Sequence, residues 1–220
     1  MTTKSGKMDE TATPLCEPPA EKQKRAEAIS MQNQTAAMHR LMTVKKHDAT
    51  SLHYDLRLSY NRRLLSWAVP DGPSYCPSHQ REAIQVEDHD LEYAYSERVI
   101  HEGPGTGTVM QWDWGTWVPL PGYTDVNTCL RNGLLRFTLF GEKLKGNWTL
   151  ARVESHTRTR PNAVWTLTKE QDSFARNEAA SNIVDEAPNS ISTGRTMKEI
   201  AEAPNKSKCK DKHQRKLFDE

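Results

Sequence analysis

Residues 53–58, HYDLRL, hold three polar side chains whose types and spacing suit phosphate chemistry. Side chains alternate between the two faces of a β-strand, so His53, Asp55 and Arg57 would share one face if this segment is a strand. The other face would carry tyrosine and leucine and would belong in a core. A solvated ion pair on an exposed face is the simplest alternative, although such faces favour Lys, Glu and Thr.

Two histidines elsewhere in the chain extend this row into a candidate metal site. His47 lies six residues before His53, and His89 lies in the segment VEDHDLEY. Together with Asp55 they supply two imidazoles and one carboxylate, a set that suits Mn²⁺, Zn²⁺ or Fe²⁺. Spacing alone does not decide the point, because the chain has eight histidines and a single histidine is more often structural than a ligand.

Arg57 favours a phosphate substrate over the other reactions that such a metal site supports. A metal ion polarises phosphoryl oxygens, and a guanidinium forms paired hydrogen bonds with them. An oxygenase built on two histidines and one carboxylate has less need of an arginine beside the metal. Tyr93, four residues after His89, would add a hydroxyl donor, although a packed aromatic ring is the alternative role for it.

The elements that would position these residues are β-strands. Eight short segments between residues 41 and 170 are rich in β-branched and aromatic residues, and Gly, Pro, Asn and Asp separate them. The pattern predicts an all-β sandwich or barrel, and no long segment in this range has helical periodicity. The segments are LMTVKKH, HYDLRLSY, RLLSWAVP, REAIQVEDH, GTVMQWDWGTWVP, LLRFTLFG, NWTLARV and AVWTLTKE.

Composition divides the chain into one domain and two polar flanks. The apolar fraction of 35% is low for a chain that is folded throughout. A short helix is expected near 196–203, where Thr196 and Glu199 fit a capping box. The expected organisation is a flexible N-terminal arm (1–39), a β-domain (40–175) and a polar C-terminal segment that ends in a basic tail (176–220).

Charge and cysteine content limit the setting of the protein. The formal net charge is +1, so a site for a polyanion must be a local patch. No apolar run is long enough for a transmembrane span or a secretory signal. The four cysteines form no CxxC pair, which indicates a reduced, intracellular protein. Cytoplasm and nucleus are not distinguished, and a monomer is expected.

Six ordered segments resemble a known family, the 3′-phosphoesterase domain of bacterial DNA ligase D and its stand-alone relatives. The resemblance covers about residues 40–203, and SISTGRTMKEIAEA looks like the sequence that follows this domain in the family. The six segments are KHDATSLHYDLRL, SWAVPDGPS, VEDHDLEY, GTVMQWDWGTW, LFGEKLKGNWTLARV and WTLTKEQDSFA.

The resemblance implies a mainly β fold, a small closed β-barrel with short flanking helices and disordered tails. It implies a metal-dependent hydrolase that removes a 3′-phosphate, and in many members a 3′-terminal ribonucleotide, during repair of DNA breaks by non-homologous end joining. One divalent ion is implied, Mn²⁺ first, with Zn²⁺ or Co²⁺ as alternatives. The implied partners are DNA or RNA-tipped DNA 3′ ends and a DNA ligase or other end-joining proteins, with no membrane.

The resemblance also implies roles for residues at matching positions. The metal ligands would be His47, Asp55 and His89. The residues that hold the phosphate and act in catalysis would be His53, Arg57, Tyr93 and Arg81. Local cations that would track the DNA backbone, or equally be ordinary solvated charges, are Arg62, Arg63, Lys143 and Lys145.

Three departures from the family pattern bear on the activity. Asp71 stands where the family has lysine, and EGPGTG over 102–107 is one residue short and lacks the family's tyrosine. The N-terminal arm of the family is echoed only by Asp9 and Glu17. These changes touch ribonucleotide removal more than phosphatase action, because the metal and phosphate residues are all present. The alternatives are a catalytically weakened DNA-end-binding or scaffold module of the same fold, and a cupin-like metal enzyme acting on a small molecule.

Overall fold

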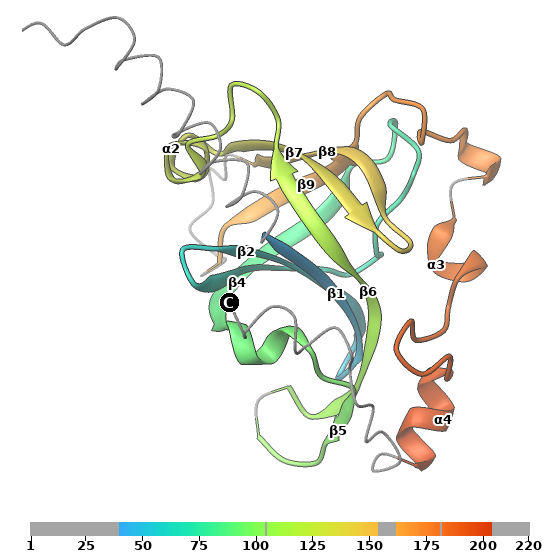
Figure 1. Cartoon of the computed structure of the whole chain (residues 1–220). Helices are drawn as coiled ribbons and strands as arrows, with labels where there is room; N and C mark the ends of the chain where they lie inside the picture. The colour runs from blue at the N-terminus through green and yellow to red at the C-terminus, as the bar shows by residue number, and fades with distance from the viewer. Residues whose placement is uncertain (1–39, 104, 154–161, 181, 204–220) are drawn as a thin grey trace, which may run out of the picture. The chain divides into compact units, whose positions relative to one another are not determined.

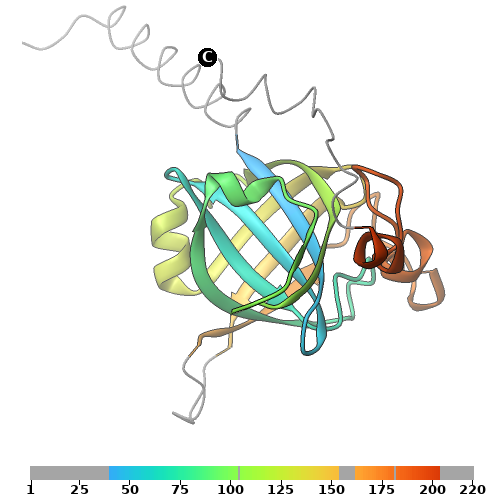
Figure 2. The same ribbon diagram turned by 90° about the horizontal axis from the view of Figure 1, so that it is seen from below.

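Eight antiparallel strands form a closed barrel in the computed structural model, which describes residues 40–103, 105–153, 162–180 and 182–203. Around the barrel the strands follow the order β1-β2-β3-β4-β9-β8-β7-β6, and pairing of β6 with β1 closes it (Figures 1 and 2). The strands are β1 (Leu41–Asp48), β2 (Leu52–Tyr60), β3 (Arg63–Val69), β4 (Arg81–Asp90), β6 (Gly107–Pro119), β7 (Leu134–Gly141), β8 (Lys145–Arg152) and β9 (Val164–Lys169). The predicted barrel is therefore confirmed, and each of the eight predicted segments contributes one strand.

A short additional strand, β5 (Arg98–Ile100), was not predicted. It pairs with the first residues of β6, opposite Gly107–Val109, whereas β7 pairs with the last residues of β6. The long strand β6 therefore pairs with β5 and β7 along one edge and with β1 along the other. In sequence, β5 follows the segment that carries Tyr93. In space, it lies next to β6.

Tryptophan side chains dominate the core that holds the barrel together. Five of them are at most 1% exposed, and the rings of Trp67 and Trp165 meet edge to face with centroids 6.0 Å apart. Burying rings of this size supplies much of the hydrophobic free energy of folding. Tyr54, Leu56 and Leu58 of β2 belong to the same cluster, so the apolar face predicted for this strand is confirmed. The five buried rings are Trp67, Trp112, Trp117, Trp148 and Trp165.

The helical elements are short and lie between or after the strands. The helix α4 has both hydrogen bonds of the predicted capping box between Thr196 and Glu199. No helix in the described parts of the chain is long and apolar enough to cross a membrane. The elements are η1 (Leu91–Ala94), α2 (Val126–Asn132), η2 (Glu178–Ala180), α3 (Ile183–Glu186) and α4 (Met197–Glu202). The predictions for residues 1–39, which include Asp9 and Glu17, and for the basic tail from 204 onward lie outside the described residues.

The segment after the barrel packs against β5 and β6 (Figure 1). The Trp112 indole donates to the carbonyl of Ala187 at 2.8 Å. The Arg195 guanidinium lies 2.7 Å from the Glu97 carboxylate, which is almost fully buried. Since Glu97 directly precedes β5, this ion pair links the C-terminal segment to the strand that borders the candidate site.

Candidate functional site

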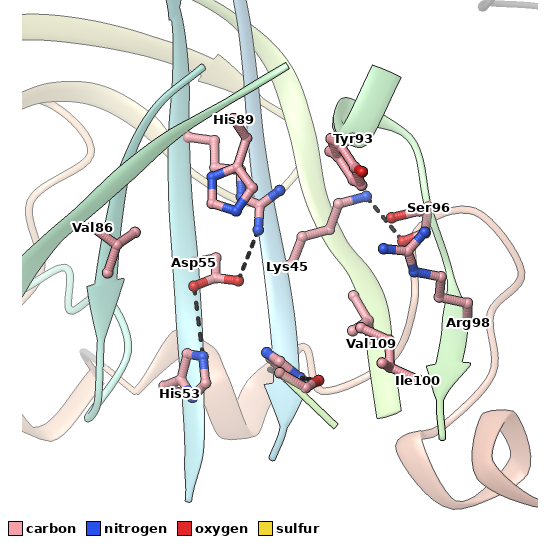
Figure 3. Close-up of a pocket in the computed structure, with 13 residues that line it drawn as sticks. Lys45, His53, Asp55, Val86, His89, Tyr93, Ser96, Arg98, Ile100 and Val109 are labelled. Atoms are coloured by element: carbon pink, nitrogen blue, oxygen red, sulfur yellow. Dashed lines mark hydrogen bonds and ion pairs between the residues drawn. The ribbon is translucent and has the colours of Figure 1, made fainter. Parts of the chain in front are cut away.

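A pocket of about 520 Å³ opens beside β1, β2 and β5, and its size suits a small ligand or the end of a larger one (Figure 3). Its wall contains three histidines, one carboxylate, two arginines and one lysine. The lining residues are Lys45, His47, His53, Asp55, Arg57, Val86, His89, Tyr93, Ser96, Arg98, Ile100, Gly105 and Val109.

The row predicted on β2 faces this pocket. His53, Asp55 and Arg57 all line it, on the side of the strand opposite the core. One oxygen of the Asp55 carboxylate lies 3.6 Å from His53 Nε2, and the other lies 3.1 Å from Arg57 Nη2. The carboxylate therefore fixes the two neighbours of its own row, which are themselves too far apart along the strand to touch directly.

Strand β1 adds a second row directly across from the first. In the antiparallel register His47 is the partner of His53, and Lys45 is the partner of Asp55. Paired residues of adjacent strands present their side chains on the same face. The imidazole rings of His47 and His53 lie with centroids 4.8 Å apart. One potential ligand atom from each of His47, His53 and Asp55 lies within 4.8 Å of the others, so this group can hold a metal ion.

Hydrogen bonds on one ring nitrogen orient each of the three histidines. His47 Nε2 contacts the carbonyl of Gly105 at 2.9 Å, and His53 Nδ1 contacts that of Ser51 at 2.9 Å. A carbonyl only accepts, so each of these nitrogens carries the hydrogen. His89 Nδ1 lies 3.0 Å from the Ser66 hydroxyl, which itself donates to Leu64.

The second nitrogen of each ring is consequently unprotonated in the neutral form and has a lone pair available. Metal-binding histidines usually make such a hydrogen bond through the ring nitrogen that does not bind the metal. Burial lowers the pKa of His47 and of His89, with the Arg57 charge as the next cause for His89. Both effects favour neutral imidazole, the form that binds a metal. The donor set and its orientation therefore fit a divalent ion of the Mn²⁺ or Zn²⁺ type.

The predicted metal set differs by one residue from the group that is closest in space. His47, Asp55 and His89 all line the pocket. Among the described residues, however, the group whose ligand atoms lie close enough to share an ion is His47, His53 and Asp55. His89 lies beside Tyr93 instead, with ring centroids 6.1 Å apart. Which of the two imidazoles is the third ligand stays a prediction.

Positive charge dominates the lining of the pocket. Arg57 and Arg98 face a single carboxylate, that of Asp55, among the residues that line it, whereas burial lowers the pKa of Lys45 well below its usual value. Burial lowers the pKa of Arg57, and the charge and hydrogen bond of Asp55 oppose this shift, but a guanidinium stays protonated at any physiological pH. The local patch required by a chain of net charge +1 is therefore present in this pocket, and an anion is the ligand it suits.

Sequence reasoning missed the basic residues Lys45 and Arg98 and the polar residue Ser96. Lys45 could have been found from its spacing, because it lies two residues before His47 and alternation places both on one face. Arg98 and Ser96 gave no comparable signal, since β5 is only three residues long.

The remaining predicted residues lie away from the lining. Arg81, at the start of β4, contacts Asp71 at 3.9 Å, and neither lines the pocket. Arg63 pairs with Asp90 at 2.8 Å, and Arg62 is exposed in the adjoining turn. The Lys143 ammonium donates to the carbonyls of Ala187 and Asn189, whereas Lys145 is exposed. Their contacts with DNA stay predictions.

Comparison with known proteins shows which family this barrel resembles. The sequence profile of the DNA ligase D 3′-phosphoesterase domain matches residues 45–152, which run from the middle of β1 to the end of β8 and include every residue that lines the pocket. The barrel belongs to this family. The resemblance noted in the sequence is thereby confirmed.

Similar proteins are much longer than this chain. The multifunctional non-homologous end joining protein LigD of Pseudomonas aeruginosa is 43% identical over 155 residues, which are 70% of this chain and 18% of that protein. LigD of Mycobacterium tuberculosis is 37% identical over 111 residues, 50% of this chain and 14% of that protein. LigD of Mycolicibacterium smegmatis is 30% identical over 151 residues, 62% of this chain and 20% of that protein. The chain thus spans a fifth or less of the length of these relatives.

Proposed function

We propose that this 3′-phosphoesterase domain is a divalent-metal-dependent hydrolase that removes 3′-phosphate from DNA ends in non-homologous end joining. The single observation that carries the proposal is the pocket in which Asp55 joins a histidine group to Arg57. Removal of a 3′-terminal ribonucleotide is a second reaction of the same site. A DNA ligase or another end-joining protein is the partner that would use the product.

Arg57 has the geometry to hold the terminal phosphate. Its Nη2 is engaged with Asp55, whereas its Nε is buried and has no hydrogen-bond partner among the described residues. A buried donor without a partner costs free energy, and an anionic oxygen would satisfy it. The Tyr93 hydroxyl, on the same wall, would donate to a second phosphate oxygen. These donors would stabilise the charge that grows on the phosphoryl oxygens during hydrolysis.

The metal would be held by His47, Asp55 and His89, with His53 as the competing third ligand. When bound, a divalent ion supplies Lewis-acid polarisation of a phosphoryl oxygen. Mn²⁺ is the proposed ion, and Zn²⁺ and Co²⁺ suit the same imidazole and carboxylate donors.

His53 is the proposed proton donor to the leaving 3′-oxygen. Its Nδ1 is tied to the Ser51 carbonyl, so Nε2 is the nitrogen that faces Asp55 and the pocket. When the ring carries both protons, Nε2 would be the nitrogen that donates. An imidazole that gives its Nε2 proton to the leaving group cannot use that nitrogen as a ligand. The two roles of His53 are therefore mutually exclusive.

Purified protein, Mn²⁺ and a primer–template that ends in a 3′-phosphate test this proposal. The expected product is the 3′-hydroxyl primer, formed only with a divalent ion present. A parallel primer that ends in a single ribonucleotide tests the second reaction. Binding of the 3′-phosphate end without any turnover would instead support the weakened scaffold module.

A further inference from the structure

The strand β5 presents a basic side chain to the pocket from the wall opposite the histidines. Ser96, Arg98 and Ile100 line the pocket at every second position, as alternation along an extended strand requires. Glu97, between them, points the other way and pairs with Arg195 at 2.7 Å. Figure 3 shows Arg98 beside Lys45 and Ser96, with His53 on the far side of the pocket.

The Arg98 guanidinium is held without an ion pair in the described parts of the chain. It lies over the Tyr93 ring, 5.6 Å from the ring centroid. This cation–π contact holds the guanidinium beside the ring without neutralising its charge. Tyr93 thus serves both as a candidate phosphate donor and as the platform for a second cation.

Lys45 lies beside Arg98 on this wall (Figure 3), and burial lowers the pKa of its ammonium well below the usual value. Its side chain is 1% exposed, and its ammonium donates to the Ser96 carbonyl at 3.0 Å and to the Gln111 side-chain oxygen. Both acceptors are neutral. Asp55, the one carboxylate among the lining residues, is already engaged by Arg57. The positive charge on the β5 side of the pocket is therefore balanced by no carboxylate that lines it.

We propose that Arg98 forms a second anion subsite, which binds the phosphodiester immediately 5′ of the terminal nucleotide. This inference rests on the proposed function, because it requires the terminal phosphate at Arg57. The next anion along a DNA strand is one nucleotide away from the reacting phosphate, and the pocket has room for more than a phosphate group. The subsite would make the enzyme prefer a strand end over a free 3′-nucleotide.

Two dinucleotides test the subsite. Both end in a 3′-phosphate and carry a 5′-fluorophore, but one has a normal internal phosphodiester and the other an uncharged methylphosphonate. The unmodified protein with Mn²⁺ should hydrolyse the charged dimer about tenfold better in kcat/KM, the effect expected of one charge-assisted hydrogen-bonded contact. Arg98→Gln should reduce this preference to near unity.

Two variants serve as controls. Arg98→Lys keeps the charge and should retain part of the preference. Arg131→Gln removes an arginine from α2, where the side chain bonds Thr128 within the helix, and should leave the preference unchanged. If the unmodified protein hydrolyses both dimers equally, the subsite is wrong and the proposed function stands.

Binding separates failure of the subsite from failure of the proposed function. Fluorescence anisotropy of the same two dimers in EDTA needs no turnover. A tighter complex with the charged dimer, lost in Arg98→Gln, supports the subsite even in a protein that hydrolyses neither dimer. Equal affinities for the two dimers, or a preference that survives Arg98→Gln, would overturn it.

Discussion

The Arg57 guanidinium lies 3.1 Å from the Asp55 carboxylate, two residues away on the same face of β2. One Arg57 nitrogen is thereby fixed, and the buried Nε has no hydrogen-bond partner among the described residues. This ion pair explains how β2 can hold the Arg57 side chain in one orientation inside the pocket.

Replacing Arg57 by lysine tests the importance of this fixed fork. Arg57→Lys keeps the charge but loses the paired donors, so kcat on a 3′-phosphate primer should fall about 100-fold. The melting temperature should change little, because the residue faces the pocket and not the core. Unchanged kcat with a raised KM would show that Arg57 binds the ground state only.

Metal titration of single variants distinguishes the two candidate ligand sets. Calorimetry with Mn²⁺ should show binding lost in His47→Ala, Asp55→Asn and His89→Ala, and retained in His53→Ala. His53→Ala should still lose turnover, because the proton donor is absent. If His53→Ala abolishes binding and His89→Ala does not, the tight group His47, His53 and Asp55 is the metal site.

Asp71 tests the effect of an anion where the family has lysine. Its side chain is 71% exposed and lies 3.9 Å from Arg81, so it partly neutralises a cation near the surface. Asp71→Lys should lower KM for a DNA primer, most clearly at low salt, where screening is weakest. The kcat should hardly change, since Asp71 does not line the pocket. Equal KM values across a salt series would show that position 71 is remote from DNA.

Lys143 should contribute to stability more than to DNA binding. Its ammonium donates to the carbonyls of Ala187 and Asn189 and lies 4.5 Å from the centroid of the Trp112 ring, which ties the C-terminal segment to β6. Lys143→Met should cost about 1–2 kcal/mol of unfolding free energy, measured by urea denaturation. Lys198→Met, on an 82% exposed side chain, is the control. A raised KM for DNA at unchanged stability would contradict this role.

The buried carboxylate of Asp113 should make the stability of the folded protein depend on pH. This carboxylate accepts from the backbone N–H groups of Lys143 and Leu144, and burial raises its pKa to about 6. The folded state therefore binds more protons than the unfolded state between about pH 4 and 6. Over that window the stability contributed by this group falls as the pH rises, and it is constant above the folded pKa.

The matched comparison for this prediction is Asp113→Asn, which cannot titrate. Relative to that variant, the unmodified protein should lose about 3 kcal/mol of unfolding free energy between pH 4 and 7. Urea denaturation of both proteins at several pH values measures the difference. Curves that stay parallel would show that the carboxylate titrates alike in the folded and unfolded states.

Local residue patterns were sufficient to predict the strands and the polar face of β2. All eight predicted segments are strands of the barrel, because alternation of apolar and polar residues is a local property of an extended chain. The same rule placed His53, Asp55 and Arg57 together on the face opposite the core. The capping box at Thr196 was predicted for the same reason, since its two hydrogen bonds join residues three apart.

The closure of the sheet and the full set of pocket residues depend on contacts between distant segments of the chain. Local alternation fits a sandwich as well as a barrel, and the choice depends on β1 pairing with β6, more than 60 residues away. That closure, with β5 added beside β6, brings Arg98 to the wall opposite His53. The metal group depends likewise on the register that sets His47 across from His53. Contacts between distant segments depend on packing and loop closure, which no local pattern of residues specifies.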